Sequence, residues 1–312
     1  MNAPSSILVA TDHSAPARLA ADRAATLAQQ FDATLTLMHT LPGGPLAELR
    51  HWLGQQPGTG QPSAADAALL QHAGQQLDHL ATELATTHPG LRVRRQLTTG
   101  SVPDEILRGA DETAADLVVL GARGAGVLRR LMLGTTAERL LPQARRPLLI
   151  VREAPFEPYR RVLVALDFSP WSLPALALAR RLAPQAQPVL LHVYRVPFEE
   201  RLAFAGIDAA KIGHYRRHLR TTGAQLLQST AREAGFGPGQ YEAVLVEGDA
   251  GPGIVAQQHE LDCDLVVLGL RGQSAAASAT GAAAPSAGSG SVVRHVLAEG
   301  ATDVLLAVAA PA

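Results

Sequence analysis

One short pattern occurs twice in this chain, and it limits the fold more than any other feature. Segments 116–124 and 264–272 both read Asp-Leu-Val-Val-Leu-Gly-x-Arg-Gly, so that an unbroken apolar run of four residues ends at a glycine. Such runs are typical of parallel strands covered on both faces, and the glycines predict a turn at the carboxyl end of the strand. We therefore expect a parallel α/β sheet with a ligand site at its carboxyl edge.

The repeat extends over both halves of the 312-residue chain. Residues 7–14 match 162–169, because each segment is an apolar run followed by Asp-x-Ser and then by a stretch with helical spacing. The later segments also correspond: strands at 34–39 and 189–193, amphipathic stretches at 64–88 and 209–235, strands at 93–98 and 243–247, the repeated pattern itself, and closing strands at 148–151 and 304–308. Each half therefore predicts five strands alternating with four helices.

This alternation predicts the fold class and the domain organisation. Strands separated by helices pair in parallel through right-handed crossovers, so we expect an α/β protein of two Rossmann-like doubly wound domains, with helices on both faces of each sheet. The domains are expected at 1–154 and 160–312, with a linker near the prolines between them. Segment 42–63 is expected to be a surface loop, and segment 273–290, nearly all Ala, Ser and Gly, is not expected to hold one packed conformation.

Composition excludes several classes of protein. A net charge of −1, from 27 basic and 28 acidic residues, gives no overall attraction to nucleic acid or to an anionic membrane. The sequence shows neither a signal-peptide pattern nor a long apolar span, so we expect a cytoplasmic protein. Cys263 is the only cysteine, which excludes an internal disulfide and a multi-cysteine metal site.

The first copy of the pattern leads into a candidate anion site. Gly121 and Gly124 are followed, after nine further residues, by the run Gly134-Thr135-Thr136. Glycines permit positive φ and close approach, so that successive amides can converge on a phosphate, and a threonine at a helix start can cap the helix or donate to an anion. Among the nearby cations, Arg123 is expected to contact the phosphate. The two glycines alone would also fit a simple tight turn.

The second copy of the pattern departs from the first. Gly269, Arg271 and Gly272 repeat its start, but seventeen residues separate Gly272 from Gly290-Ser291, the pair aligned with Gly134-Thr135 because the expected helix follows it. Ala and Ser replace the apolar residues that would anchor the first loop. Because fixing a flexible backbone costs about 1–2 kcal/mol per residue, we expect nucleotide binding in the second half to be weaker or absent.

Taken together, these residues resemble the universal stress protein family over nearly the full chain. The resemblance rests on Asp-x-Ser after the first strand, on Gly-x-Val-x-x-x-Ile-Leu from Gly100, and on Gly-x-x-Gly-x9-Gly-[Ser/Thr], the most specific of the three. It implies a strand order of 3-2-1-4-5 and, in the nucleotide-binding branch, contact of the last motif with ATP. It also implies that Asp12 and Asp167 face the adenosine end of the nucleotide, with helix capping as the alternative role.

The resemblance further implies a function. The expected protein binds ATP or ADP, with or without Mg²⁺, and acts in stress response or signalling through nucleotide-dependent association with an unidentified protein partner. Two alternatives stay open: slow ATP hydrolysis assisted by Asp12, and a nucleotide-free assembly module, as in branches without the glycine motif. In the family the last strands of two domains pair, so 148–151 and 304–308 would dock the halves as an internal pseudodimer, and two chains could form a homodimer.

Motifs of other nucleotide enzymes are absent from the sequence. The single lysine, Lys211, is not part of a Walker A motif, and the sequence holds neither a kinase set, nor Gly-x-Ser-x-Gly, nor Gly-x-Gly-x-x-Gly after a first strand. We therefore assign no catalytic residue. His214 and His218 are spaced for one helix face, where a solvated basic surface is favoured over a metal site. His39 and His192, at the ends of the second strands, are expected to be satisfied histidines rather than ligands.

Overall fold

The structure is a computed structural model, and it describes residues 3–43, 64–122, 134–154, 158–196, 204–205, 207–272 and 290–308. Of the predicted site residues, Arg123 and Gly124 lie outside the described residues, as do most of the predicted loops 42–63 and 273–290. The chain divides into two compact units, Asn2–Glu157 and Pro158–Ala312, called here the first and the second domain.

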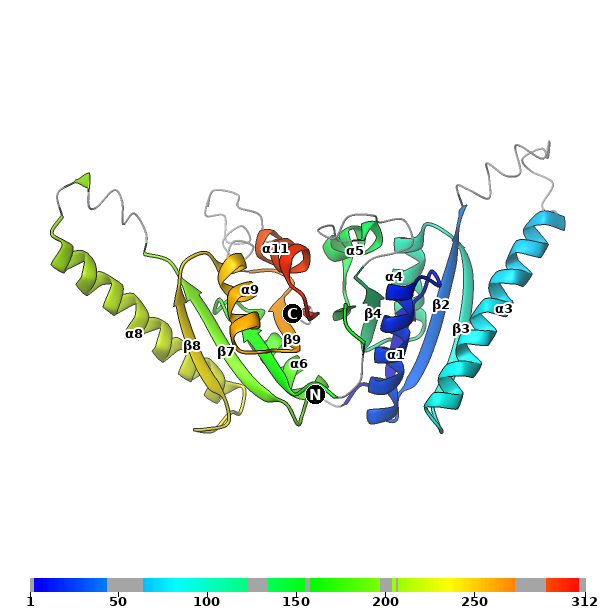
Figure 1. The fold of residues 1–312 in the computed structure, drawn as a ribbon, viewed down its shortest axis with the longest axis horizontal. Coiled ribbons are helices and arrows are strands. Elements are labelled where there is room, and N and C mark those ends of the chain that lie inside the picture. Colours follow the sequence, from blue (N-terminus) through cyan, green and yellow to red (C-terminus); the bar gives the residue numbers. More distant parts are fainter. Residues whose placement is uncertain are drawn as a thin grey trace. The chain divides into compact units, whose positions relative to one another are not determined.

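The first domain alternates strands and helices along the chain (Figure 1). Its elements are β1 (Ser6–Ala10), α1 (Ala15–Gln30), β2 (Thr34–Pro42), α3 (Ala64–Thr87), β3 (Arg92–Gly100), α4 (Val102–Glu112), β4 (Leu117–Gly121), α5 (Thr135–Leu140), the 3₁₀ turn η1 (Leu141–Gln143) and β5 (Leu148–Val151). The apolar run of the repeated pattern therefore lies in β4, as expected from its unbroken Leu and Val residues.

The second domain repeats this order of elements (Figure 1). They are β6 (Arg161–Ala165), α6 (Ser172–Leu182), β7 (Gln187–Tyr194), α8 (Ala209–Glu233), β8 (Glu242–Glu247), α9 (Ala250–Glu260), β9 (Leu265–Gly269), α11 (Ser291–Glu299) and β10 (Asp303–Ala307). Helix α6 is shorter than its counterpart α1, because Pro184 follows it closely and cannot continue a helix.

Each domain has a parallel sheet of five strands in the expected order. In the first domain the order is β3-β2-β1-β4-β5, and in the second it is β8-β7-β6-β9-β10. The register places Ala10 beside Met38, so β1 and β2 end at the same edge. Strand order reverses at β1, between β2 and β4, and ligands of such sheets bind at this switch point. The prediction of a doubly wound α/β fold is confirmed.

The core lies at the central strands, which are buried on both faces. Ile7, Leu8 and Val9 are all fully buried, although successive side chains of a strand point to opposite faces. Helix α1 packs on β1 and β4, while α4 packs on β1, β2 and β3. Burial of this kind explains why β1 and β4 read as unbroken apolar runs rather than as alternating ones.

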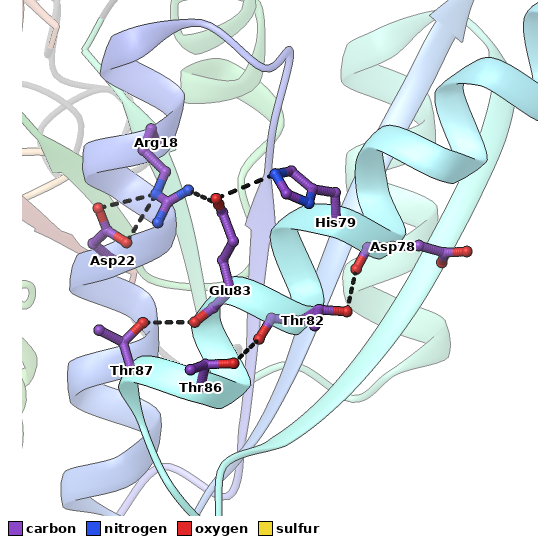
Figure 2. Close-up of polar contacts among 8 residues, drawn as sticks. All are labelled: Arg18, Asp22, Asp78, His79, Thr82, Glu83, Thr86 and Thr87. Atoms are coloured by element: carbon purple, nitrogen blue, oxygen red, sulfur yellow. Dashed lines mark hydrogen bonds and ion pairs between the residues drawn. The ribbon is translucent and has the colours of Figure 1, made fainter.

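Polar contacts fasten α1 to α3 at the surface of the first domain (Figure 2). The guanidinium of Arg18 pairs with Glu83 of α3 and with Asp22 one turn further along α1, where Nε lies 3.1 Å from Oδ1. His79 Nε2 lies 3.2 Å from the other oxygen of Glu83. The bond donated by Arg18, and then its charge, lower the pKa of the Glu83 carboxyl below its ordinary value. Since these side chains are partly exposed, the network orients α3 more than it stabilises the fold.

None of the helices in the described ranges is both long enough and apolar enough to cross a membrane.

Candidate functional site

A pocket opens at the carboxyl edge of the first domain's sheet. Its volume is ≈ 370 Å³, within the range of about 300–1,000 Å³ usual for small-molecule sites. The ends of β1, β2 and β4 line it together with the starts of α4 and α5 and the first turns of α1. The structure brings five of the predicted site residues together around this pocket: Asp12, Gly121, Gly134, Thr135 and Thr136.

Asp12 is held by a tight turn between β1 and α1. Its Oδ1 accepts hydrogen bonds from the backbone N–H of Ser14, at 3.0 Å, and from the Ser14 hydroxyl. Ser14 is the N-cap of α1, and its Oγ accepts from the N–H of Ala17. The turn places His13 in the left-handed region, with φ of 60°. The Asp-x-Ser motif therefore caps α1 through Ser14 and also puts Asp12 on the pocket wall.

The start of α5 contributes two hydroxyls to the pocket. The N–H of Gly134 donates to the carbonyl oxygen of Ala122 at 3.2 Å, which closes the base of the glycine loop. Gly134 is the N-cap of α5, and no side chain caps this helix. Within the described part of the chain, no hydrogen bond engages the side chain of Thr135 or Thr136. Both hydroxyls line the pocket and are available to a ligand.

Gly121 is required by packing, and of the two properties that glycine offers, close approach and positive φ, it uses close approach. Its φ lies outside the left-handed region. A Cβ atom at this position would lie 2.7 Å from the carbonyl oxygen of Pro16 and 3.0 Å from the backbone nitrogen of Ala17. Gly269 repeats the arrangement, since its Cβ would lie 2.8 Å from Cβ of Trp171. In both domains glycine allows the end of the fourth strand, β4 or β9, to approach the start of the first helix, α1 or α6.

The end of β2 forms a further wall of the pocket. His39 Nδ1 lies 2.7 Å from the carbonyl oxygen of Thr11. Because a carbonyl only accepts, Nδ1 carries the proton and donates it, which leaves Nε2 as an acceptor in the neutral ring. His192 makes the same contact with the carbonyl oxygen of Leu166, at 2.8 Å. In each domain this histidine ties the second strand to the end of the first.

The corresponding edge of the second domain also carries an aspartate in the turn after its first strand. Asp167 Oδ1 accepts from the N–H of Ser169 at 3.0 Å and from the Ser172 hydroxyl at 3.1 Å. Its Oδ2 lies 2.7 Å from the place where a Cβ of Gly272 would be. A phosphate that approached Gly272 would therefore meet a carboxylate. Repulsion between these like charges disfavours an anion at this loop.

The polar lining of the first pocket also lacks counterparts in the second domain. Aligning the Asp-x-Ser, histidine and glycine positions of the two halves pairs hydroxyls with apolar side chains: Thr11 with Leu166, Thr40 with Val193, and Thr136 with Val292. Ser291 retains one hydroxyl, and the Arg294 guanidinium lies over Gly290 and adds positive charge. The second edge thus has a cation near the helix start, where the first has Glu138, and lacks three of the hydrogen-bonding groups.

The entry into the last helix differs as well. Gly134 has an extended backbone, with φ of −61° and ψ of 140°, whereas Gly290 has φ of −109° and ψ of −2°. Among the described residues, no bond from Gly290 to Leu270 repeats the one that joins Gly134 to Ala122. Arg271 is exposed beside the loop. The second loop is therefore longer and is not closed at its base in the same way.

The described residues contain neither a cluster of metal-binding side chains nor a reactive thiol. Within the described ranges, no three Asp, Glu, His or Cys side chains converge as a metal site. Burial is the main cause that raises the pKa of the Cys263 thiol to about 11, so that it stays protonated at neutral pH.

Several pocket residues are missing from the site predicted from the sequence. Thr11, Met38 and Thr40 line the pocket from the strand ends, and Val102 and Ile106 line it from α4. Thr11 and Thr40 directly follow the predicted strands and stand beside residues already considered. Taking every residue that follows a strand in a parallel sheet would have found them, whereas the contribution of α4 depends on helix packing.

Comparison with known proteins places both halves in one family. The profile described as "Universal stress protein family" matches residues 5–152 and 158–307. A universal stress protein of Methanocaldococcus jannaschii is 29% identical over 147 residues, which cover 47% of this chain and 81% of that protein. Universal stress protein G of Shigella flexneri is 31% identical over 134 residues, covering 42% of this chain and 85% of its own length.

A solved structure is similar over the whole chain. The crystal structure of a universal stress protein from Archaeoglobus fulgidus matches with a TM-score of 0.62 and 17% identity, covering 97% of this chain and 98% of that chain. At this identity the likeness supports the fold alone.

Proposed function

Because the chain belongs to the universal stress protein family, we propose that its first domain binds an adenine nucleotide, ATP or ADP, and that the bound state controls association with a protein partner. Nucleotide binding is typical of this family. The observation that carries the proposal is the pocket at the carboxyl edge of the first sheet, lined by Asp12, Gly134 and two threonines whose hydroxyls have no partner in the described chain.

The chemistry of the pocket fits a nucleotide. Val102, Ile106 and Leu120 provide apolar surface for a base, and Asp12 provides an acceptor for ribose hydroxyls. Thr135 and Thr136 provide donors for phosphate oxygens. Hydrogen bonds to charged groups contribute about 1.5–3 kcal/mol each, and micromolar affinity needs about 8 kcal/mol in total, so a few such bonds with burial of the base are sufficient.

Magnesium would accompany the phosphates rather than occupy a site built from the chain alone. Mg²⁺ is usually held by one or two protein oxygens together with substrate phosphates and water. The described residues form no cluster of three metal-binding side chains, which agrees with this mode of binding.

The proposal is tested by identifying nucleotide released from the protein. The full chain is purified without added nucleotide and denatured, and the soluble fraction is separated by anion-exchange chromatography. We expect ATP or ADP in the wild type and much less in the double variant Thr135→Ala, Thr136→Val, while Ser291→Ala retains the wild-type amount. Absence of nucleotide in the wild type, together with no ATP binding by calorimetry, would refute the proposal and favour the nucleotide-free assembly module.

The same preparation tests slow ATP hydrolysis. Phosphate release above the blank that disappears in Asp12→Ala, while ATP still binds, would favour a hydrolase. Release no greater than the blank would leave binding as the function.

A further inference from the structure

His13 is a residue of the Asp-x-Ser turn that the site predicted from the sequence does not contain. Its ring lies against that of His39, with centroids 4.7 Å apart and planes tilted by 50°. His39 in turn lines the pocket and is bonded to the carbonyl of Thr11. The His13 ring therefore packs against a residue of the pocket wall. Its buried Nε2 has no hydrogen-bond partner among the described residues.

The surroundings of His13 oppose its protonation on balance. Burial lowers the pKa of His13 below 6.5, and His39 on β2 and His72 on α3 lower it further, whereas Asp12 in the same turn raises it. The positive end of α1, which begins at Ala15, acts in the same direction as the two histidines. Because the pKa is depressed in the folded site, falling pH below 6.5 favours states in which His13 has left its place against His39.

The second domain provides a natural comparison for this position. Phe168 occupies the same place in its turn, with a left-handed φ of 59° against 60° for His13. Its ring lies 4.4 Å from that of His192, with planes tilted by 41°. The place therefore accepts a ring that cannot be protonated, and its geometry does not need the imidazole nitrogens. The imidazole adds the ability to gain a charge.

We propose that His13 is a positioning residue that makes nucleotide binding by the first domain sensitive to pH, because the neutral ring holds His39 and the Asp12 turn against the pocket and the protonated ring leaves. The imidazolium has two N–H donors and no acceptor, so its Nε2–H would be buried without an acceptor in the described structure. When the protonated ring leaves the site, its Nε2–H is no longer buried without an acceptor, and the turn that carries Asp12 is released. The inference rests on the proposed nucleotide site and concerns its regulation.

The test compares three full-length proteins: wild type, His13→Phe and Phe168→His. ATP affinity is measured by calorimetry at pH 7.5, 6.5 and 5.5. We expect equal affinity of wild type and His13→Phe at pH 7.5. At pH 5.5 the wild type should bind up to about tenfold more weakly than His13→Phe, the limit set by protonation one pH unit below the ordinary imidazole pKa of 6.5. Phe168→His should show the pH dependence of the wild type. Titration of the ATP phosphates affects all three proteins alike. A parallel loss in wild type and His13→Phe would overturn the proposal.

A second measurement needs no nucleotide. NMR titration of the ligand-free chain should show one transition below pH 6.5 that moves the resonances of Thr11, Ser14 and His39 together, and this transition should be absent in His13→Phe. If His39 and the turn titrate identically in both proteins, His13 does not position them. Failure of the wild type to bind ATP at pH 7.5 would refute the proposed function, while the ligand-free titration would still decide the role of His13.

Discussion

The two domains share one fold and differ where their strands end. Both have the same strand order, and both have a residue with left-handed backbone at the same position of the turn after the first strand. In both, a histidine of the second strand is hydrogen-bonded to the end of the first strand. Both also need glycine at the end of the fourth strand, at Gly121 and Gly269, because the start of the domain's first helix lies against it. A motif residue that serves packing in both domains is therefore weak evidence for a ligand in either.

The features that differ are the ones that bear on function. The first edge has threonines where the second has Leu166, Val193 and Val292, and the base of its glycine loop is closed by a bond from Gly134. The two domains therefore share their fold, and they differ in the polar residues at the ends of the strands.

The largest expected effect is a loss of stability that should be similar in the two domains. Gly121→Ala places a Cβ 2.7 Å from the carbonyl oxygen of Pro16, which is backbone and cannot rotate away. We expect a loss of about 2–4 kcal/mol in the free energy of unfolding of the first domain, and a loss of similar size in the second domain for Gly269→Ala. Calorimetric unfolding of the full chain measures both.

A glycine in α3 provides the control for these two variants. A Cβ on Gly74 would meet no atom closer than 4.0 Å, that of Leu97 Cδ2. Gly74→Ala should therefore raise stability by up to about 1 kcal/mol, as expected for alanine inside a helix. If Gly121→Ala were as well tolerated as Gly74→Ala, the packing role of Gly121 would be wrong.

An intermediate effect is expected on ATP affinity, and it should appear when hydroxyls are removed from the first domain but not from the second. The double variant Thr135→Ala, Thr136→Val removes the hydroxyls at the start of α5 and makes position 136 like Val292. We expect ATP affinity to fall by about 1–3 kcal/mol, with little change in the unfolding temperature because neither hydroxyl is bonded within the described chain. Titration calorimetry of the full chain measures the affinity. Ser291→Ala is the matched control, and an equal loss in this variant would place the site in the second domain.

The smallest effect concerns a surface contact of the first domain. Arg18→Gln removes the partner that lowers the pKa of Glu83. A depressed carboxyl pKa contributes stability at pH above its ordinary value of 4.5, and this contribution is lost as pH falls through the folded value. Arg18→Gln should therefore slightly lower the unfolding temperature at pH 7 and lower it less near pH 3. An equal decrease at both values would mean that the arginine acts through packing.

The fold could be predicted from the sequence because its signals are local. Unbroken apolar runs such as that of β4, and the helical spacing between them, are properties of consecutive residues. Each of these patterns occurs in both halves of the sequence. The alternation then leaves few ways to arrange the sheet.

The candidate site could be predicted only in part. Asp12 and the run Gly134-Thr135-Thr136 carry a motif, and the structure places them around one pocket. Thr40 follows a predicted strand and could have been found by the same rule as Asp12. Ile106 belongs to the Gly-x-Val-x-x-x-Ile-Leu motif, but its place at the pocket depends on the packing of α4. The role of Gly121 depends on its distance from Pro16, far away in the sequence. His13 has meaning only once its ring is seen against that of His39.

Hydrogen–deuterium exchange of the full chain with and without ATP tests the central claim most directly, namely that the two domains share a fold and only the first binds nucleotide. We predict slower exchange with ATP in residues 10–17, 38–42 and 134–140, which line the first pocket or continue from it, and unchanged exchange in residues 165–172, 191–195 and 290–297. Protection that appears in the second domain instead, or equally in both, would contradict the account.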